Sequence, residues 1–159
     1  MKGLATMAEF KTIGDVLKLA TEKEQEAVAF YSKAVSIVAN PGTRVMLQEL
    51  AREEKQHVAY LSDIQAGTSS AAVRSKPLPP GMDLSSYLVS EPLSDNSTPQ
   101  DVMILAIKRE DKAIAFYSGQ LPVVRETELY PLFEQLLAWE KEHKERLEAE
   151  YDQVVLKDN

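Results

Sequence analysis

The chain has 159 residues, of which 44% are hydrophobic and 27% charged, and its formal net charge is −7. This length fits a single domain, the absence of cysteine excludes disulfides, iron–sulfur clusters and thiol catalysis, and the negative charge argues against nucleic-acid binding. No stretch is apolar enough to cross a membrane, and residues 1–11 lack the apolar core of a signal peptide, so we expect a cytoplasmic protein with no membrane partner.

The first two predicted helices form an antiparallel pair. Thr12 begins the first helix, with Asp15 at the capping-box position three residues later, and this helix runs to about Asn40. Asn40 and Pro41 then begin a second helix, which ends near Gly67. Because the connection is so short, the two helices must be antiparallel. Their inward stripes contain Leu17, Ala20, Glu24, Ala27, Tyr31, Ala34 and Val38 in the first helix, and Leu47, Leu50, Glu54, His57, Leu61 and Ile64 in the second.

A long linker is predicted over residues 67–97. This segment is rich in serine, proline and glycine and has no sustained hydrophobic period. Structureless connections of that length are uncommon in compact domains unless they span a distance or have a role of their own. Tyr87 and Leu88 are the residues that we expect to anchor the linker to the helices.

A second helical pair follows the linker. Thr98 and Pro99 begin a third helix, which Pro122 ends, and a fourth helix begins at about Thr127. Four long helices with a long connection in the middle predict an all-α four-helix bundle with a crossover between helices 2 and 3. The inward stripes are Val102, Ala106, Glu110, Ala113 and Tyr117, then Phe133, Leu136, Glu140, His143, Leu147 and Tyr151. The predicted ranges are 12–66 and 98–156 for the helical pairs and 1–159 for the single domain.

The two helical pairs carry two copies of one sequence unit, and these copies contain both histidines of the chain. Glu54-Lys-Gln-His57 and Glu140-Lys-Glu-His143 each place a histidine three residues after a glutamate. Each motif lies 30 residues after the first glutamate of a second repeated string. The two strings are Glu24-Gln-Glu-Ala-Val-Ala-Phe-Tyr31 and Glu110-Asp-Lys-Ala-Ile-Ala-Phe-Tyr117.

The repeated carboxylates and imidazoles fall on the inward stripes, which predicts a metal site. In each Glu-x-x-His motif the two side chains project to the same side of the helix and can hold one ion. Antiparallel pairing brings the first glutamate of each copy level with the motif on the neighbouring helix. Four carboxylates would balance two divalent cations, and this donor set suits iron or manganese better than zinc or copper(I). The predicted ligands are Glu24, Glu54, His57, Glu110, Glu140 and His143.

A chance arrangement is the alternative to a metal site. A single Glu-x-x-His on a charged helix is usually a solvated surface pair. Two copies on apolar stripes are different, because buried carboxylates without cations are costly and would have to bind protons. A bundle that served only as a scaffold would have apolar residues at these positions, so we favour the metal site.

Residues next to the predicted ligands have weaker assignments. Tyr31 and Tyr117 lie seven residues beyond Glu24 and Glu110, too far to touch the carboxylate of their own helix, but their hydroxyls could hydrogen-bond a ligand on an adjacent helix. Trp139 is expected to pack in a core or interface rather than to relay electrons. The residues expected at the solvated surface are Glu26, Glu53, Glu142, Lys141, Lys144 and Arg146.

The six ligands in this spacing resemble the di-iron carboxylate site of the ferritin-like superfamily, specifically of rubrerythrin-like and bacterioferritin-like proteins. The resemblance implies a ferritin-like bundle with two irons that react with dioxygen or hydrogen peroxide. It also implies that Glu54 and Glu140 bridge the two irons, that Glu24 and Glu110 are terminal ligands, and that each histidine holds one iron.

Departures from these families narrow the expected chemistry. Ala113 stands where rubrerythrins proper carry an extra ligand glutamate, and Lys55 stands where bacterioferritins carry a haem-binding methionine, so no haem is expected. The cysteine-free chain has no rubredoxin domain, so a separate electron donor protein would be needed. The closest resemblance is to a rubrerythrin-like domain that stands alone.

Three functions remain open from the sequence. The first is a peroxidase- or ferroxidase-like enzyme that protects against oxidative stress, with H₂O₂ or O₂ as its oxidant. The second is an iron-binding, trafficking or storage protein without catalytic turnover, and the third is a helical scaffold with a relict site. A homodimer is a further expectation, because long amphipathic helices often leave a second apolar face.

Overall fold

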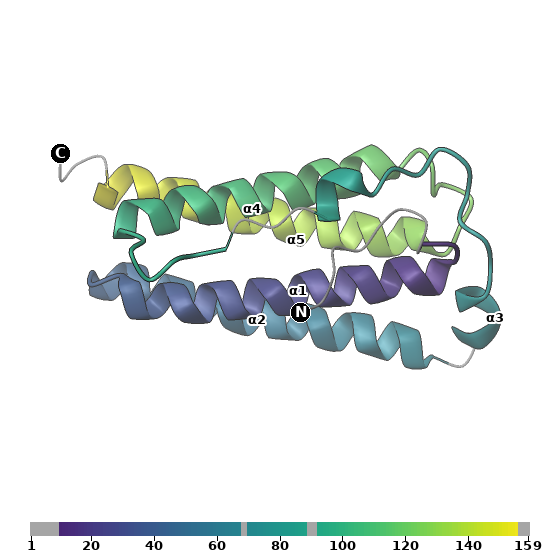
Figure 1. Ribbon diagram of the computed structural model, residues 1–159, viewed down its shortest axis with the longest axis horizontal. Helices are drawn as coiled ribbons and strands as arrows, with labels where there is room; N and C mark the ends of the chain where they lie inside the picture. Colours follow the sequence, from purple (N-terminus) through teal and green to yellow (C-terminus); the bar gives the residue numbers. More distant parts are fainter. Residues whose placement is uncertain (1–9, 68–69, 89–91, 156–159) are drawn as a thin grey trace.

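Four long helices make up the bundle in the computed structural model, which describes residues 10–67, 70–88 and 92–155. Figure 1 shows them as two antiparallel pairs lying against each other: α1 (Ile13–Ile37) beside α2 (Pro41–Ala66), and α4 (Pro99–Gln120) beside α5 (Leu129–Glu150). The predicted all-α bundle is therefore confirmed. No helix in the described part of the chain has both the length and the apolarity that a bilayer crossing requires.

Local hydrogen bonds explain where the first pair begins and turns. The Thr12 hydroxyl accepts from the Asp15 amide, and the Asp15 carboxylate accepts from the Thr12 amide, which caps α1. The helix ends at Ile37, three residues before the predicted end at Asn40. The Asn40 side chain accepts from the amide of Thr43 and so caps α2, and the following proline disfavours a helical conformation at Asn40. Asn40 therefore cannot belong to both helices.

The second pair repeats the first capping device. Thr98 and Asp101 form a capping box at the start of α4, which ends at Gln120, just before Pro122. The last helix α5 begins two residues after the predicted start at Thr127, and it continues into a π-helical turn, η3 (Tyr151–Val155). The predicted end of this pair at residue 156 lies outside the described residues.

The crossover contains two short helices that the sequence pattern did not reveal. They are α3 (Ser70–Arg74) and the 3₁₀ turn η2 (Ser85–Leu88), both too short to show a hydrophobic period. Since α2 ends and α4 begins at opposite ends of the bundle, the crossover has to travel along it (Figure 1). An antiparallel bridge between Thr12 and Pro77 ties it to the start of α1. Tyr87 is buried and Leu88 packs against the same cluster, so both anchor the crossover as expected.

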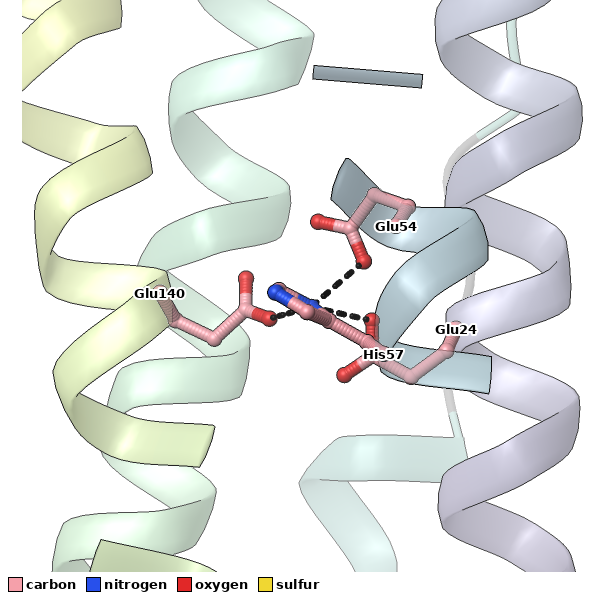
Figure 2. A group of neighbouring side chains, drawn as sticks. All are labelled: Glu24, Glu54, His57 and Glu140. Atoms are coloured by element: carbon pink, nitrogen blue, oxygen red, sulfur yellow. Dashed lines mark hydrogen bonds and ion pairs between the residues drawn. The ribbon is translucent and has the colours of Figure 1, made fainter. Parts of the chain in front are cut away.

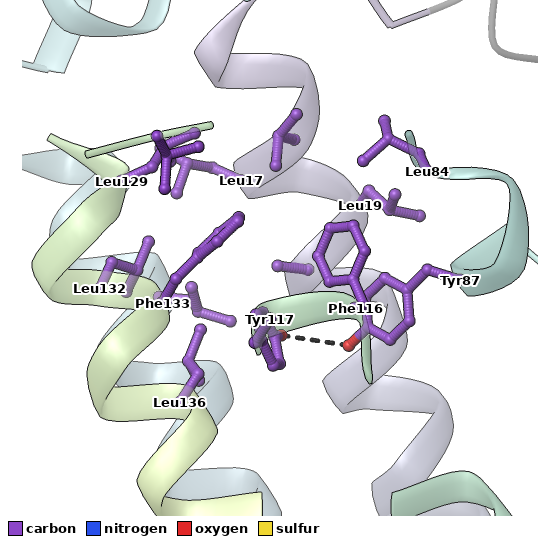
Figure 3. Close-up of a cluster of buried hydrophobic side chains, with 14 of the residues drawn as sticks. Leu17, Leu19, Leu84, Tyr87, Phe116, Tyr117, Leu129, Leu132, Phe133 and Leu136 are labelled. Carbon is purple, nitrogen blue, oxygen red and sulfur yellow. Dashed lines mark hydrogen bonds between the residues drawn. The ribbon is translucent and has the colours of Figure 1, made fainter. Parts of the chain in front are cut away.

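Two hydrophobic clusters lie on either side of a polar layer at mid-height. Figure 3 shows the cluster at the end of the bundle where α1 and α5 begin. It includes Leu17, Tyr87, Phe116 and Phe133. The second cluster occupies the other end of the bundle, and its buried members are Phe30, Tyr31, Ala34, Val38, Leu47, Leu50, Ala51, Leu93, Val102, Met103, Ala106 and Leu147. The predicted ligands fall between these clusters on all four long helices.

One stripe residue does not face the core. Ile64 on α2 was expected to point inward, but it is 36% exposed. Gln65, one residue later and four residues after the buried Leu61, takes the inward position and donates to the Thr21 hydroxyl at 2.7 Å. The inward face of α2 thus rotates past Ile64 in its last turn.

Candidate metal centre

Six buried side chains, all of them predicted ligands, meet in the polar layer. Each is at most 5% exposed. The first glutamate of each sequence copy comes from α1 or α4, whereas the Glu-x-x-His motifs come from α2 and α5. Antiparallel pairing and the equal spacing of the two copies therefore bring them to one level.

The first half of the site surrounds His57. Its Nδ1 lies 3.4 Å from Glu24 Oε2, 3.3 Å from Glu54 Oε2 and 3.4 Å from Glu140 Oε1 (Figure 2). Ligand atoms of these four residues all lie within 4.8 Å of one another. This spacing allows one ion to contact all four residues.

The second half surrounds His143 and shares two glutamates with the first. His143 Nδ1 lies 2.9 Å from Glu54 Oε1, 3.6 Å from Glu110 Oε1 and 3.9 Å from Glu140 Oε2. These four residues form a second group that meets the same 4.8 Å limit. One oxygen of Glu54 and one of Glu140 approach each histidine, so these two carboxylates lie between the two groups.

Three buried carboxyl groups of the cluster have shifted pKa values, two raised and one lowered. Burial raises the pKa of Glu24 well above its ordinary value, and the negative charge of Glu54 adds to this effect. Burial also raises the pKa of Glu140, with Glu110 and Glu54 contributing further. Burial would likewise raise the pKa of Glu54, but its close contacts with Glu24 and both histidines outweigh this effect and lower that pKa. In the metal-free protein, Glu54 thus stays ionised, whereas Glu24 and Glu140 favour their protonated forms.

Both histidines bind protons tightly for the same reason. Burial lowers the pKa of His57, but its close contacts with the carboxylates of Glu24 and Glu54 outweigh this effect and raise the pKa to about 9. Burial also lowers the pKa of His143, but its close contacts with the carboxylates of Glu110 and Glu54 outweigh this effect and raise the pKa to about 10. Protons thus take the place of cations in this acidic pocket.

Unsatisfied atoms test whether cations fit the site. Among the described residues, six buried side-chain atoms lack a hydrogen-bond partner, and five of them belong to this cluster. They are Glu54 Oε1 and Oε2, Glu110 Oε2, Glu140 Oε1 and His143 Nδ1. Burying an oxygen or nitrogen atom without a partner costs free energy of folding. All five atoms are of the kinds that coordinate divalent metal ions, namely carboxylate oxygen and imidazole nitrogen. The residues present therefore fit a pair of divalent ions.

The two predicted tyrosines have different partners. The Tyr31 hydroxyl on α1 donates to Glu110 Oε1 on α4 at 2.6 Å, which orients a predicted ligand of the opposite helical pair. The Tyr117 hydroxyl lies 3.1 Å from the hydroxyl of Tyr87, a residue of the crossover. Tyr117 therefore contacts the wall of the site rather than donating to a carboxylate.

Two residues that were expected at the solvated surface contact a histidine or its neighbour, and Trp139 packs against the core as expected. Glu53, expected to be solvated, places Oε2 only 3.2 Å from His143 Nε2, and Arg146, expected at the surface, donates to the same Glu53 oxygen. Trp139 stacks on His57 with ring centroids 4.5 Å apart. The available signal was position, since Glu53 and Trp139 directly precede the two Glu-x-x-His motifs. Glu26 and Glu142 are exposed as expected.

A small cavity reaches the cluster from the side of α1 and α4. It encloses about 50 Å³ and is lined by the carboxylates of Glu24, Glu110 and Glu140 together with Ala113. Basic side chains of both helices, including Lys108 and Arg109, stand in its wall. The histidines on α2 and α5 are not part of this lining, so the open side of the centre faces away from them.

Comparisons with known proteins agree with this arrangement. A family model described as a ferritin-like domain matches residues 13–151, which include all six predicted ligands. A solved structure of a hypothetical protein from Pyrococcus furiosus is similar, with a TM-score of 0.65, 26% sequence identity and coverage of 94% of each chain. None of the curated proteins compared with this chain matches it. The chain belongs to the family of ferritin-like domains.

Proposed function

We propose that this protein is a non-haem di-iron protein of the rubrerythrin type that reacts with hydrogen peroxide or dioxygen. The observation that carries the proposal is the pair of buried four-residue groups that share Glu54 and Glu140. Four carboxylates and two imidazoles match the charge and the donor preference of two iron ions, with manganese as the alternative. The ferritin-like family and the unsatisfied buried oxygens support the same assignment.

The chain supplies the ligands and their orientation. His57 and His143 would each hold one ion through Nδ1, while Glu54 and Glu140 would serve both ions. Tyr31 fixes the oxygen of Glu110 that it contacts, which leaves the other Glu110 oxygen free of hydrogen bonds. When bound, the iron pair would supply the electrons and the Lewis acidity that reduce an O–O bond.

The size of the cavity favours a small oxidant. A volume of about 50 Å³ has room for only a few molecules of the size of water, dioxygen or hydrogen peroxide. Ala113 lines this cavity with a methyl group, at the position where rubrerythrins proper carry an additional glutamate. The size of the cavity therefore suits dioxygen or hydrogen peroxide, and the cavity leads to one face of the centre.

Turnover also requires a source of electrons. These 159 residues contain no cysteine that could hold an iron–sulfur cluster, so we propose that a separate electron donor protein reduces the centre. A peroxidase would draw repeatedly on this donor, whereas a ferroxidase would use Fe(II) itself as the reductant. The two activities differ in the reductant that sustains them.

An anaerobic Fe(II) titration of metal-free protein tests the proposal, followed by stopped-flow absorbance after mixing with H₂O₂ or, separately, with O₂. We expect about two irons per chain, rapid oxidation, and recovery when reductant is added. Glu54→Ala should abolish both binding and oxidation, while Glu142→Ala, which removes an exposed glutamate from α5, should leave both unchanged. Lack of saturable binding near two irons would refute the di-iron assignment, and binding without turnover would refute the enzyme.

A further inference from the structure

The two halves of the centre differ at one equivalent position of the repeat. Glu53 directly precedes the first Glu-x-x-His motif, and Trp139 directly precedes the second. Each side chain reaches the histidine of the other helical pair, so Glu53 contacts His143 and Trp139 contacts His57. A carboxylate in one half thus corresponds to an indole ring in the other.

Glu53 fixes the orientation of His143. Its Oε2 lies 3.2 Å from His143 Nε2, while His143 Nδ1 faces Glu54 and Glu110. When His143 is neutral, as a metal ligand must be, a proton kept on Nε2 beside Glu53 leaves the Nδ1 lone pair directed at the carboxylates. That is the tautomer which a metal ion requires, and carboxylates behind ligating histidines commonly enforce it.

Arg146 holds Glu53 in this position. Its Nη1 donates to Glu53 Oε2 at 2.6 Å, and its Nη2 donates to Glu49 Oε2 at 2.9 Å. Arg146 lies on α5, one turn after His143, whereas both glutamates lie on α2. This clamp joins the two helices and holds the Glu53 carboxylate beside His143.

His57 has no corresponding carboxylate. Within the described ranges, all of its carboxylate contacts run through Nδ1, and none involves Nε2. Instead, Trp139 covers the ring face at an interplanar angle of 9°, and Tyr60 meets Trp139 edge-on. Stacking holds the plane of the imidazole but does not select which nitrogen carries the proton.

We propose that the two metal positions have unequal affinity and that Glu53 is the positioning residue which makes the His143 position fill before the His57 position. This inference rests on the proposed di-metal function. Removing a carboxylate that orients a ligating histidine typically weakens metal binding by about 10- to 100-fold. A difference of that size between the positions would separate the two binding steps.

Trp139 offers a direct readout, because it is the only tryptophan in the chain and stacks on His57. Metal-free protein is titrated with Fe(II) under anaerobic conditions, and tryptophan fluorescence is recorded together with the amount of iron bound at equilibrium. Quenching by a bound paramagnetic ion is strongest for the ion held by His57. We expect the second equivalent of iron to cause most of the quenching.

Two variants test the role of Glu53. Glu53→Gln should weaken binding at the His143 position by about 10- to 100-fold, which makes the two positions similar and shifts part of the quenching into the first equivalent. Arg146→Gln, which releases the clamp but keeps the carboxylate, should act in the same direction with a smaller effect. Glu134→Gln removes the same charge from an exposed position on α5 and should leave the order unchanged. Far-UV circular dichroism establishes that each variant is folded.

The outcomes separate this inference from the function on which it rests. Equal quenching by the two equivalents in the unmodified protein would overturn the proposed order of filling. A Glu53→Gln titration identical to that of the unmodified protein would overturn the role of Glu53. Absence of saturable binding in any variant would instead overturn the di-metal function itself, and the inference with it.

Discussion

The two helical pairs carry two copies of one sequence unit, yet their equivalent tyrosines have different partners. Tyr31 and Tyr117 both lie seven residues after a predicted ligand and are both buried. Tyr31 donates to Glu110, whereas Tyr117 meets Tyr87 of the crossover. The repeat therefore supplies matched ligands, and the crossover, which lies against only one side of the bundle, makes their surroundings unequal.

Tyr87 shows how the crossover does this. Its ring stacks on Phe116 of α4 with centroids 4.2 Å apart and an interplanar angle of 6°. It also lines the cavity that reaches the predicted ligands. Among the described residues, the chain passes between the two pairs only once, so no second crossover places an equivalent residue near Tyr31.

The largest effect on the two halves of the centre is expected when a glutamate that both halves share is removed. Glu140→Ala should abolish binding of both metal ions, because Glu140 approaches both histidines. Glu110→Ala should cost only the ion at the His143 position, so about half of the bound metal remains. Metal content per folded chain measures the difference. Equal loss in the two variants would show that the halves do not share Glu140.

Removing the Tyr87 ring should have the second largest effect, which is a loss of stability. Tyr87→Ala should lower the free energy of unfolding by about 3–5 kcal/mol, as expected when a buried aromatic side chain is truncated. Tyr87→Phe keeps the stacked ring and loses only the contact with the Tyr117 hydroxyl, which is worth about 1 kcal/mol. Urea denaturation measures both, and similar losses would mean that the stack is not what anchors the crossover.

The pH dependence compares the centre with and without metal. Both histidines have a raised pKa in the folded state, about 9 for His57 and about 10 for His143. Their contribution to stability is complete below the unfolded pKa of about 6.5 and is lost as the pH rises through 9 to 10. The raised pKa of Glu24 and Glu140 acts in the same direction, because their protonated forms are favoured by folding.

We therefore expect the thermal midpoint of metal-free protein to fall between pH 6 and pH 10. The lowered pKa of Glu54 opposes this trend only below its ordinary value, outside that window. Metal binding displaces the protons, so added Mn(II) should stabilise most at the alkaline end. A double variant with His57→Leu and His143→Leu is the control and should show a shallower fall. An equally steep fall in that variant would show that other groups control the titration.

The smallest expected effect is the loss of metal affinity when the hydroxyl of either tyrosine is removed. Tyr31→Phe should weaken binding of one metal ion by about 10-fold, because Glu110 loses the hydroxyl that orients it. Tyr117→Phe should change metal affinity less, since its hydroxyl meets Tyr87 instead of a carboxylate. Competition with a chelator measures both affinities. Equal losses would show that the crossover does not isolate Tyr117 from the ligands.

Much of the fold and of the candidate site follows from local patterns. Thr12, Asn40 and Thr98 identify the starts of three helices, because a capping side chain satisfies amides of the first turn next to it in sequence. The six repeated carboxylates and imidazoles meet at one level, since equal spacing on antiparallel helices aligns them. The end of α1 was placed too late, because Asn40 was counted as part of a helix although it caps the next one.

The tertiary structure decided what lies around these ligands. Glu53 points off the inward stripe of α2, so helical periodicity alone predicted a solvated residue, but the neighbouring α5 brings His143 and Arg146 against that face. Trp139 reaches His57 for the same reason. Periodicity describes one helix against one core, whereas contacts in a four-helix bundle also depend on which helices are adjacent. The sequence by itself thus determined which six side chains meet in the core, and only the packing of α2 against α5 and the course of the crossover decided how the two halves of this cluster differ.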